Sequence, residues 1–92
     1  MRRGTAHILF ASGGLIVPAR TAYERQLLRE HVLASVHHRQ QVQVSLGRHA
    51  WLVTQATPEH AVVCTSCDRQ INHAVCHQVG SSAASCVVCA LQ

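Results

Sequence analysis

Two short apolar runs rich in β-branched residues open the chain, at residues 6–11 and 15–19. They are joined by Ser12, Gly13 and Gly14, and glycine supplies the positive φ that a tight turn needs. Pro18 lies where the second run closes. The pattern therefore predicts a β-hairpin at the start of the chain.

The next stretch has the period of a helix. Thr21 and Glu24 have the spacing of a capping box, in which each side chain accepts a hydrogen bond from the backbone amide of the other. Apolar side chains then recur at helical spacing, at Leu28, Val32 and Val36. We expect one amphipathic helix that starts at Thr21 and ends near residues 38–40.

Alternation returns after the helix, in QVQVSL at residues 41–46 and HAWLVTQ at residues 49–55. A turn around Gly47 would join them as a second hairpin, with Trp51 in the core. Pro58 has the placement of a turn or helix start, and it separates a body from the cysteine-rich segment. The expected fold class is α+β: a small β/α body at 1–57 and a metal-binding module at 58–92 packed on it, as one folded unit.

Composition limits the classes of function. All eight basic residues are arginine, and the formal net charge is +4 with neutral histidines. Four cysteine thiolates and one Zn²⁺ would change this to +2, which is too weak to identify a nucleic-acid surface by itself.

No apolar run approaches the roughly 20 residues of a membrane span, so no membrane role is expected. Residues 1–20 have the outline of a secretory signal, but His7, Gly13 and Gly14 interrupt its apolar stretch. We therefore expect a retained N-terminus and a cytoplasmic protein.

All five cysteines lie in the segment 64–89, where their spacing carries most of the chemical information. Cys64 and Cys67 form one C-x2-C pair, Cys86 and Cys89 form a second, and eighteen residues separate the two pairs. This is the spacing of a four-cysteine zinc site, because each short turn presents two thiolates to one tetrahedral ion. Zn²⁺ is the expected cofactor, with Cys64, Cys67, Cys86 and Cys89 as its ligands.

Other interpretations of the segment stay open at this point. Two disulfides would leave the fifth cysteine over, and redox C-x-x-C chemistry or an iron–sulfur cluster would use the same residues. His73, Cys76 and His77 lie between the pairs, and any of them could replace a ligand or hold a second metal. The simpler expectation is that Cys76 is a small buried side chain and the two histidines lie at the surface.

No enzyme is expected. A catalytic zinc site needs an open coordination position with an acid or base beside it, and Glu59 and Asp68 are the only acidic residues near the cysteines.

The segment is similar to the zinc-ribbon class in general. More narrowly, CTSCDRQI at 64–71 and CVVC at 86–89 resemble the zinc finger of the DksA/TraR family, whose members bind RNA polymerase and alter transcription initiation. The matching positions are the four cysteines and Ile71, in under a third of the chain. Asp68 stands where that family usually has glycine, its basic and proline positions between the pairs are absent, and the β-rich body has no counterpart in a coiled-coil arm. The resemblance supports zinc binding more than a polymerase target.

We therefore expect a small non-enzymatic zinc-binding regulatory protein that binds nucleic acid directly, or a nucleic-acid machine such as RNA polymerase. The alternative is a protein–protein adaptor or inhibitor, for instance from a phage or mobile element, or a small subunit of a larger assembly. A secreted disulfide-linked domain is a third reading. The sequence does not fix an oligomeric state.

Overall fold

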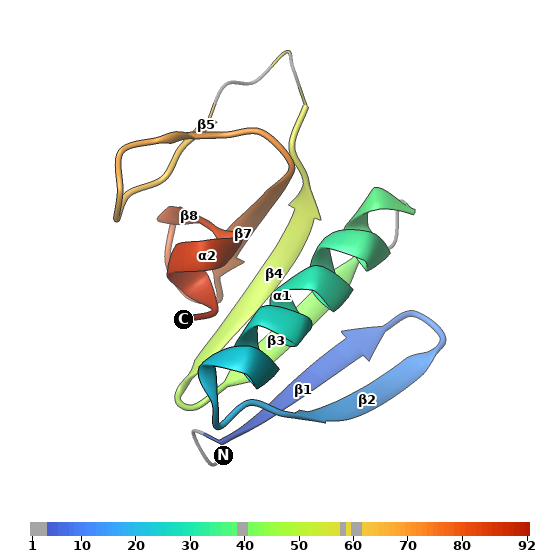
Figure 1. The fold of residues 1–92 in the computed structure, drawn as a ribbon. Helices are drawn as coiled ribbons and strands as arrows, with labels where there is room; N and C mark the ends of the chain where they lie inside the picture. The colour runs from blue at the N-terminus through green and yellow to red at the C-terminus, as the bar shows by residue number, and fades with distance from the viewer. Residues whose placement is uncertain (1–3, 39–40, 58, 60–61) are drawn as a thin grey trace.

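The computed structural model of the protein describes residues 4–38, 41–57, 59 and 62–92. Its main feature is an antiparallel six-stranded sheet with strand order β2-β1-β3-β4-β7-β8, beside a small two-stranded sheet of β5 and β6 (Figure 1). The elements are β1 Thr5–Phe10, β2 Gly13–Pro18, α1 Ala22–His37, β3 Val42–Leu46, β4 His49–Gln55, β5 Val62–Val63, β6 Gln70–Ile71, β7 Ala74–Gln78, β8 Ala84–Cys86 and α2 Val87–Ala90. The predicted α+β class, with its two hairpins, main helix and C-terminal cysteine cluster, is confirmed.

The N-terminal hairpin has a shorter turn than the sequence indicates. Phe10 pairs with Gly13, so only Ala11 and Ser12 form the loop. Gly13 and Gly14 begin β2, and Gly13 uses a φ of +148° that other residues rarely adopt. The prediction that Ser12, Gly13 and Gly14 together form the turn is therefore wrong, because a two-residue loop already reverses the chain.

Helix α1 begins at the predicted capping box. The Glu24 amide donates to Thr21 Oγ1 at 3.0 Å, and the Thr21 amide donates to Glu24 Oε1 at 3.0 Å. The helix ends at His37 with His38 as its C-cap, and Arg39 and Gln40 lie outside the described residues.

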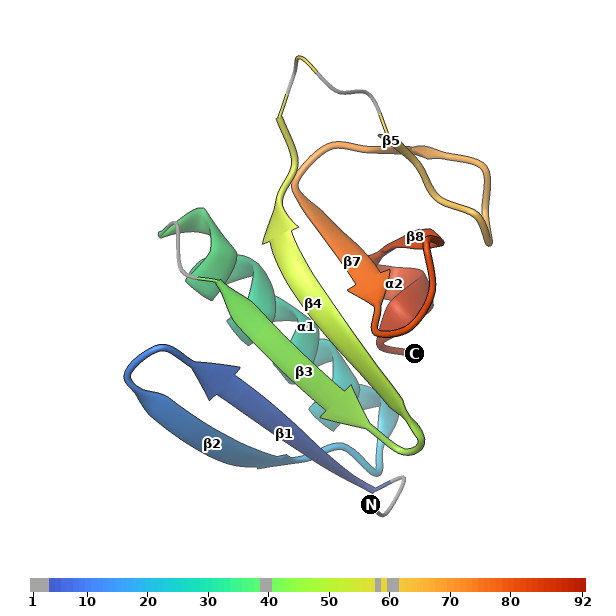
Figure 2. The same cartoon turned by 180° about the vertical axis from the view of Figure 1, so that it is seen from behind.

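Both helices α1 and α2 cover the same face of the main sheet, and neither lies on the opposite face in the reverse view (Figure 2). Alternate strand residues point toward the helices, as the two-residue period of a strand requires. The resulting core consists of Ala6, Ile8, Ala19, Leu28, Val32, Val36, Val42, Val44, Val53, Ala74, Cys76, Val87 and Leu91. Trp51 is only half-buried at its edge, where it packs against this core.

The cysteine-rich segment adds to the main sheet two strands, β7 and β8, that the sequence analysis did not predict. β7 pairs with β4 along Trp51↔Gln78, Val53↔Cys76 and Gln55↔Ala74, and β8 pairs with β7. The main sheet thus includes residues from both sides of position 57, while the division of the chain at that position stays a prediction.

Pro58, for which a turn or helix start is predicted, lies outside the described residues. Within the described residues, the helices are too short or too polar to cross a lipid bilayer.

Candidate metal centre

The first cysteine pair lies on a tight turn between β5 and β6. The Cys64 carbonyl accepts from the Asp68 amide at 2.9 Å, and the Cys64 amide donates to the Arg69 carbonyl at 2.9 Å. Asp68 has a φ of 61°, in the left-handed region that glycine, asparagine and aspartate adopt most readily. It stands where the zinc finger family described above usually has glycine, and its conformation is one that glycine adopts readily.

The second pair lies at the junction of β8 and α2. Cys86 ends β8 and is the N-cap of α2, and Cys89 lies within that single helical turn. This junction brings the Cys86 and Cys89 sulfurs into the same group of donor atoms. Thr65 ties the two pairs together, since its amide donates to the Ala84 carbonyl at 2.9 Å and its hydroxyl to the same oxygen at 3.0 Å.

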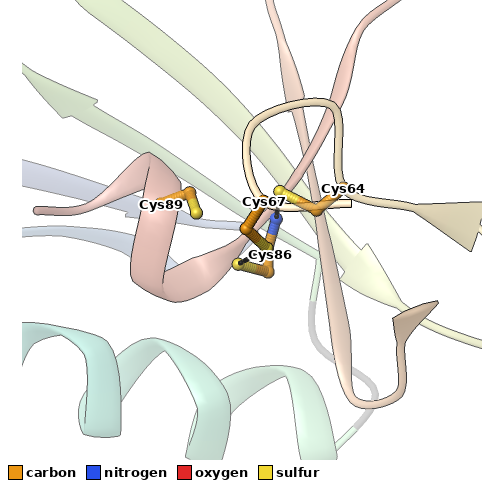
Figure 3. A group of neighbouring side chains, drawn as sticks. All are labelled: Cys64, Cys67, Cys86 and Cys89. Atoms are coloured by element: carbon orange, nitrogen blue, oxygen red, sulfur yellow. Dashed lines mark hydrogen bonds between the residues drawn. The ribbon is translucent and has the colours of Figure 1, made fainter. Parts of the chain in front are cut away.

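The four sulfur atoms gather at one point (Figure 3). They all lie within 4.8 Å of one another, and the Cys67 and Cys86 sulfurs are 4.0 Å apart. Zn–S bonds of about 2.3 Å in a tetrahedron place sulfurs about 3.8 Å apart. The observed cluster is therefore close to what a tetrahedral thiolate site needs, and its soft donors are those that zinc prefers.

A small apolar cluster surrounds the site. Cys64 is fully buried and packs with Ile71, Val75 and Ala84, while Cys67 is exposed. Ile71, the fifth residue of the family resemblance, thus supports the fold around the cysteines. All five cysteines, each in a described part of the chain, are free thiols.

The local electrostatics of the cluster favour an unequal ionisation of its thiols. Burial raises the pKa of Cys64, but hydrogen bonds from the amides of Cys86, Cys67 and Ser66 outweigh it and lower the pKa to about 6. The Cys86 amide donates to the Cys64 sulfur at 3.4 Å. The pKa of Cys89 is raised to about 12, mainly through its contact with Cys86 and then through burial. One thiolate thus forms readily, and Cys89 keeps its proton until a cation neutralises the cluster.

The three other candidate ligands lie apart from the four sulfurs. Among the described residues, the one group of donors close enough to hold an ion contains neither His73, Cys76 nor His77. Cys76 points to the helix-covered face of the sheet, where burial raises its pKa to about 12. β7 is a strand, so His77 faces the opposite side of the sheet from Cys76, and His73 is exposed beyond the start of the strand.

A groove runs past the exposed side of the cluster, with a volume of about 560 Å³. Its walls include Cys67, Cys86 and Cys89, with the apolar side chains of Leu33 and Val88 and the charge of Arg69. The sequence analysis did not find this groove, because Leu33 comes from α1 and only the fold brings it near the cysteines. The helical spacing of the apolar residues in α1 predicts that this helix packs against another part of the chain, but it does not identify that part.

No protein-family model matches the chain, and neither a curated protein nor a solved structure is significantly similar to it. Its function is therefore argued from its own residues. They establish a four-cysteine cluster that could bind a metal, in a module consistent with a zinc ribbon.

Proposed function

We propose that this protein is a non-enzymatic zinc-binding protein whose metal ion holds a binding surface in shape. The observation that carries the proposal is the convergence of Cys64, Cys67, Cys86 and Cys89 within 4.8 Å. Four thiolates complete the tetrahedral shell of zinc, so the ion has no open position for a substrate or an attacking water. Such a closed site stabilises structure and contributes its binding energy to folding.

The surface that the metal supports binds nucleic acid or a nucleic-acid machine such as RNA polymerase. The chain keeps a formal charge of +2 with zinc bound, and all of its cations except histidine are arginines, which suit phosphate recognition. The resemblance to the DksA/TraR zinc finger covers only residues that shape the cysteine cluster. It therefore supports metal binding by the cysteines. RNA polymerase is proposed only as one example of a target.

A protein–protein adaptor or inhibitor is the second candidate. The groove beside the cluster favours it, because it has apolar walls and the adjacent Val88 is 58% exposed. An exposed apolar surface of this kind often marks a contact with another protein.

The metal assignment is tested by elemental analysis of the purified chain and of two cysteine variants. We expect about one zinc per wild-type chain, since one cluster of four sulfurs is present among the described residues. Cys67→Ser removes a ligand and should lose the zinc. Cys76→Ala is the matched control, because Cys76 lies in the main core, and it should keep the zinc with a loss of about 1 kcal/mol in stability. Loss of the zinc from Cys76→Ala would show that the ligand assignment is wrong.

The binding partner is tested by titrating the zinc-loaded protein with DNA and RNA at several salt concentrations. Phosphate contacts make the affinity fall steeply with salt. Steep salt dependence supports the nucleic-acid proposal. The absence of any binding, together with retained zinc, would point to the protein–protein candidate.

A further inference from the structure

A second concave site lies at the end of the molecule where α1 begins. Its walls come from the N-terminal half of α1, the turn between β3 and β4, and the last residues of the chain, which lie at the same end in Figure 1. The pocket has a volume of about 330 Å³ and is lined by Arg25, Gly47, Arg48, His49, Trp51 and Gln92, among others. The cysteine cluster is not part of it.

The charged side chains that line this pocket all have one sign. Arg25 and Arg48 contribute two guanidinium groups, and the lining, all of it in described parts of the chain, contains no acidic side chain. Arg25 Nε donates to the Ala19 carbonyl at 2.8 Å, which fixes the guanidinium in the wall and leaves its two Nη nitrogens as the further donors. A guanidinium fork matches the oxygens of a phosphate group.

The far wall of the pocket is also held in place. Arg29, one helical turn after Arg25, donates from Nη1 to the Leu91 carbonyl at 3.1 Å. This bond ties the end of α2 to α1, so the pocket is already formed in the folded chain. Gly47 presents no side chain at the turn, which lets a ligand approach the backbone there.

Aromatic rings complete the lining. Trp51, the single tryptophan of the chain, packs on the core with part of its surface and lines the pocket with the rest. The His49 ring lies 6.2 Å from it, tilted by 46°. His49 Nδ1 and Gln78 Nε2 are 2.7 Å apart; with the amide donating, the neutral imidazole has its hydrogen on Nε2 and offers a further donor.

We propose that this pocket binds one nucleotide of a single-stranded nucleic acid, with the phosphate at Arg25 and Arg48 and the base against Trp51. The inference rests on the proposed nucleic-acid function and deepens it. Base stacking on aromatic side chains beside arginines is the usual chemistry of single-strand binding. The pocket lies near the lower end of the roughly 300–1,000 Å³ range of small-ligand sites, so it fits a splayed-out base and not a duplex.

The experiment follows the fluorescence of Trp51 while the zinc-loaded protein is titrated with single strands of about eight thymidines or uridines. Stacking should quench the fluorescence, and the lone tryptophan makes the signal specific to this pocket. Arg48→Gln should weaken binding about five- to tenfold and reduce the salt slope by about 0.7, because one phosphate contact is lost. Arg20→Gln is the matched control: it removes the same charge from an exposed side chain outside the pocket and should change affinity less than twofold, a change of about 0.4 kcal/mol at most.

A second pair of variants tests the stacking contact through the anisotropy of a labelled strand. Trp51→Phe retains an aromatic face and should keep most of the affinity, whereas Trp51→Leu should lose about tenfold or more. Equal losses in both variants would mean that Trp51 acts only as a core residue, and would overturn the proposal.

Four further outcomes would overturn it. Strand binding without quenching, and with equal effects of Arg48→Gln and Arg20→Gln, would place the nucleic-acid surface elsewhere and leave the proposed function standing. Equal affinity for thymidine monophosphate and for the strand would assign the pocket to free nucleotides. Equal quenching by polyglutamate would show unspecific anion binding. Absence of any nucleic-acid binding would remove both this inference and the nucleic-acid function.

Discussion

At the scale of single residues, Asp68 shapes the first cysteine turn through its backbone. Its φ of 61° allows its amide to reach the Cys64 carbonyl at 2.9 Å, and a left-handed conformation strains most side chains. We expect Asp68→Gly to keep or slightly raise the melting temperature of the zinc-loaded protein, and Asp68→Val to lower stability by about 1–3 kcal/mol, since a β-branched residue fits this region poorly. Thermal denaturation followed by circular dichroism measures both changes.

Asp68→Asn is the control for charge in that series. Asparagine tolerates a positive φ and removes the carboxylate, so it should behave like the wild type if the backbone dominates. A large loss in Asp68→Asn would show that the carboxylate matters more than the backbone.

The pKa values of the thiols in the cluster predict how the metal affinity depends on pH. Cys89 has a pKa raised to about 12, first by its contact with Cys86, so without metal it keeps its proton at neutral pH. Metal binds the thiolate, so binding must release at least this proton, and the affinity should rise at least about tenfold per pH unit around neutrality. The raised pKa means that a proton competes with the metal for the Cys89 sulfur, so lowering the pH weakens metal binding.

Competition with a chelator of known affinity, at about pH 6.5 and about pH 8, measures this slope. Calorimetry in two buffers with different ionisation enthalpies counts the released protons. An affinity that does not change with pH would contradict the prediction.

At the scale of elements, the capping box of α1 makes a separate contribution to stability. Thr21→Ala should lower the free energy of unfolding by about 1 kcal/mol, because the Glu24 amide loses its acceptor at the helix start. Hydrogen bonds from the Thr21 backbone, followed by weaker contacts, also hold the pKa of Glu24 below its usual 4.5. A lowered carboxyl pKa stabilises the fold above the unfolded value, so this part of the stabilisation is lost as the pH falls below about 4.5.

Ser35→Ala is the matched control for this variant. The Ser35 hydroxyl donates to the His31 carbonyl within the same helix at 3.0 Å, a bond that helices do not need. Urea denaturation of both variants compares the contributions of the two hydroxyls to stability. Equal losses of unfolding free energy would show that the N-cap hydroxyl stabilises the protein no more than a hydroxyl inside the helix.

The elements also show how far local sequence determines this fold. The two predicted hairpins and α1 could be predicted because their signals are local: short apolar or alternating runs beside glycines, and a capping box four residues long. The spacing of Cys64, Cys67, Cys86 and Cys89 likewise predicted their convergence, whereas metal binding by them stays a prediction.

The strands β7 and β8 could not be predicted in the same way. The apolar residues Ala74, Val75 and Cys76 are consecutive, because both faces of β7 are covered there, and a short apolar run has no clear period. The partner of β7 is β4, about twenty residues earlier, so no local pattern marks the pair. Cys76 was interpreted among possible ligands because its neighbours in sequence are cysteines and histidines, while its neighbours in space are core side chains.

At the scale of the whole molecule, the cluster is linked to the sheet by hydrogen bonds. Thr65 bonds to β8, β8 pairs with β7, and β7 pairs with β4. Removing the metal should therefore loosen β7 and β8 and leave the pairing of β1, β2 and β3 less affected. Hydrogen exchange measured by mass spectrometry, with and without a chelator, should show the larger increase in residues 74–86, because local opening follows the weakest contacts.

Exchange that rises equally in all strands on chelation would contradict this gradient and show one cooperative unit. Exchange that does not rise in β7 would show that the cluster is independent of the sheet.

The central place of β4 in the sheet also has a consequence for protein synthesis. β4 is complete at Gln55, whereas its partner β7 is not complete until Gln78. While the ribosome adds the intervening residues, β4 has an unpaired edge of the kind that recruits other strands into aggregates. With zinc bound as proposed, the last cysteine pair helps to hold β7 and β8 in place and so to close that edge, and zinc scarcity should first reduce the yield of soluble protein.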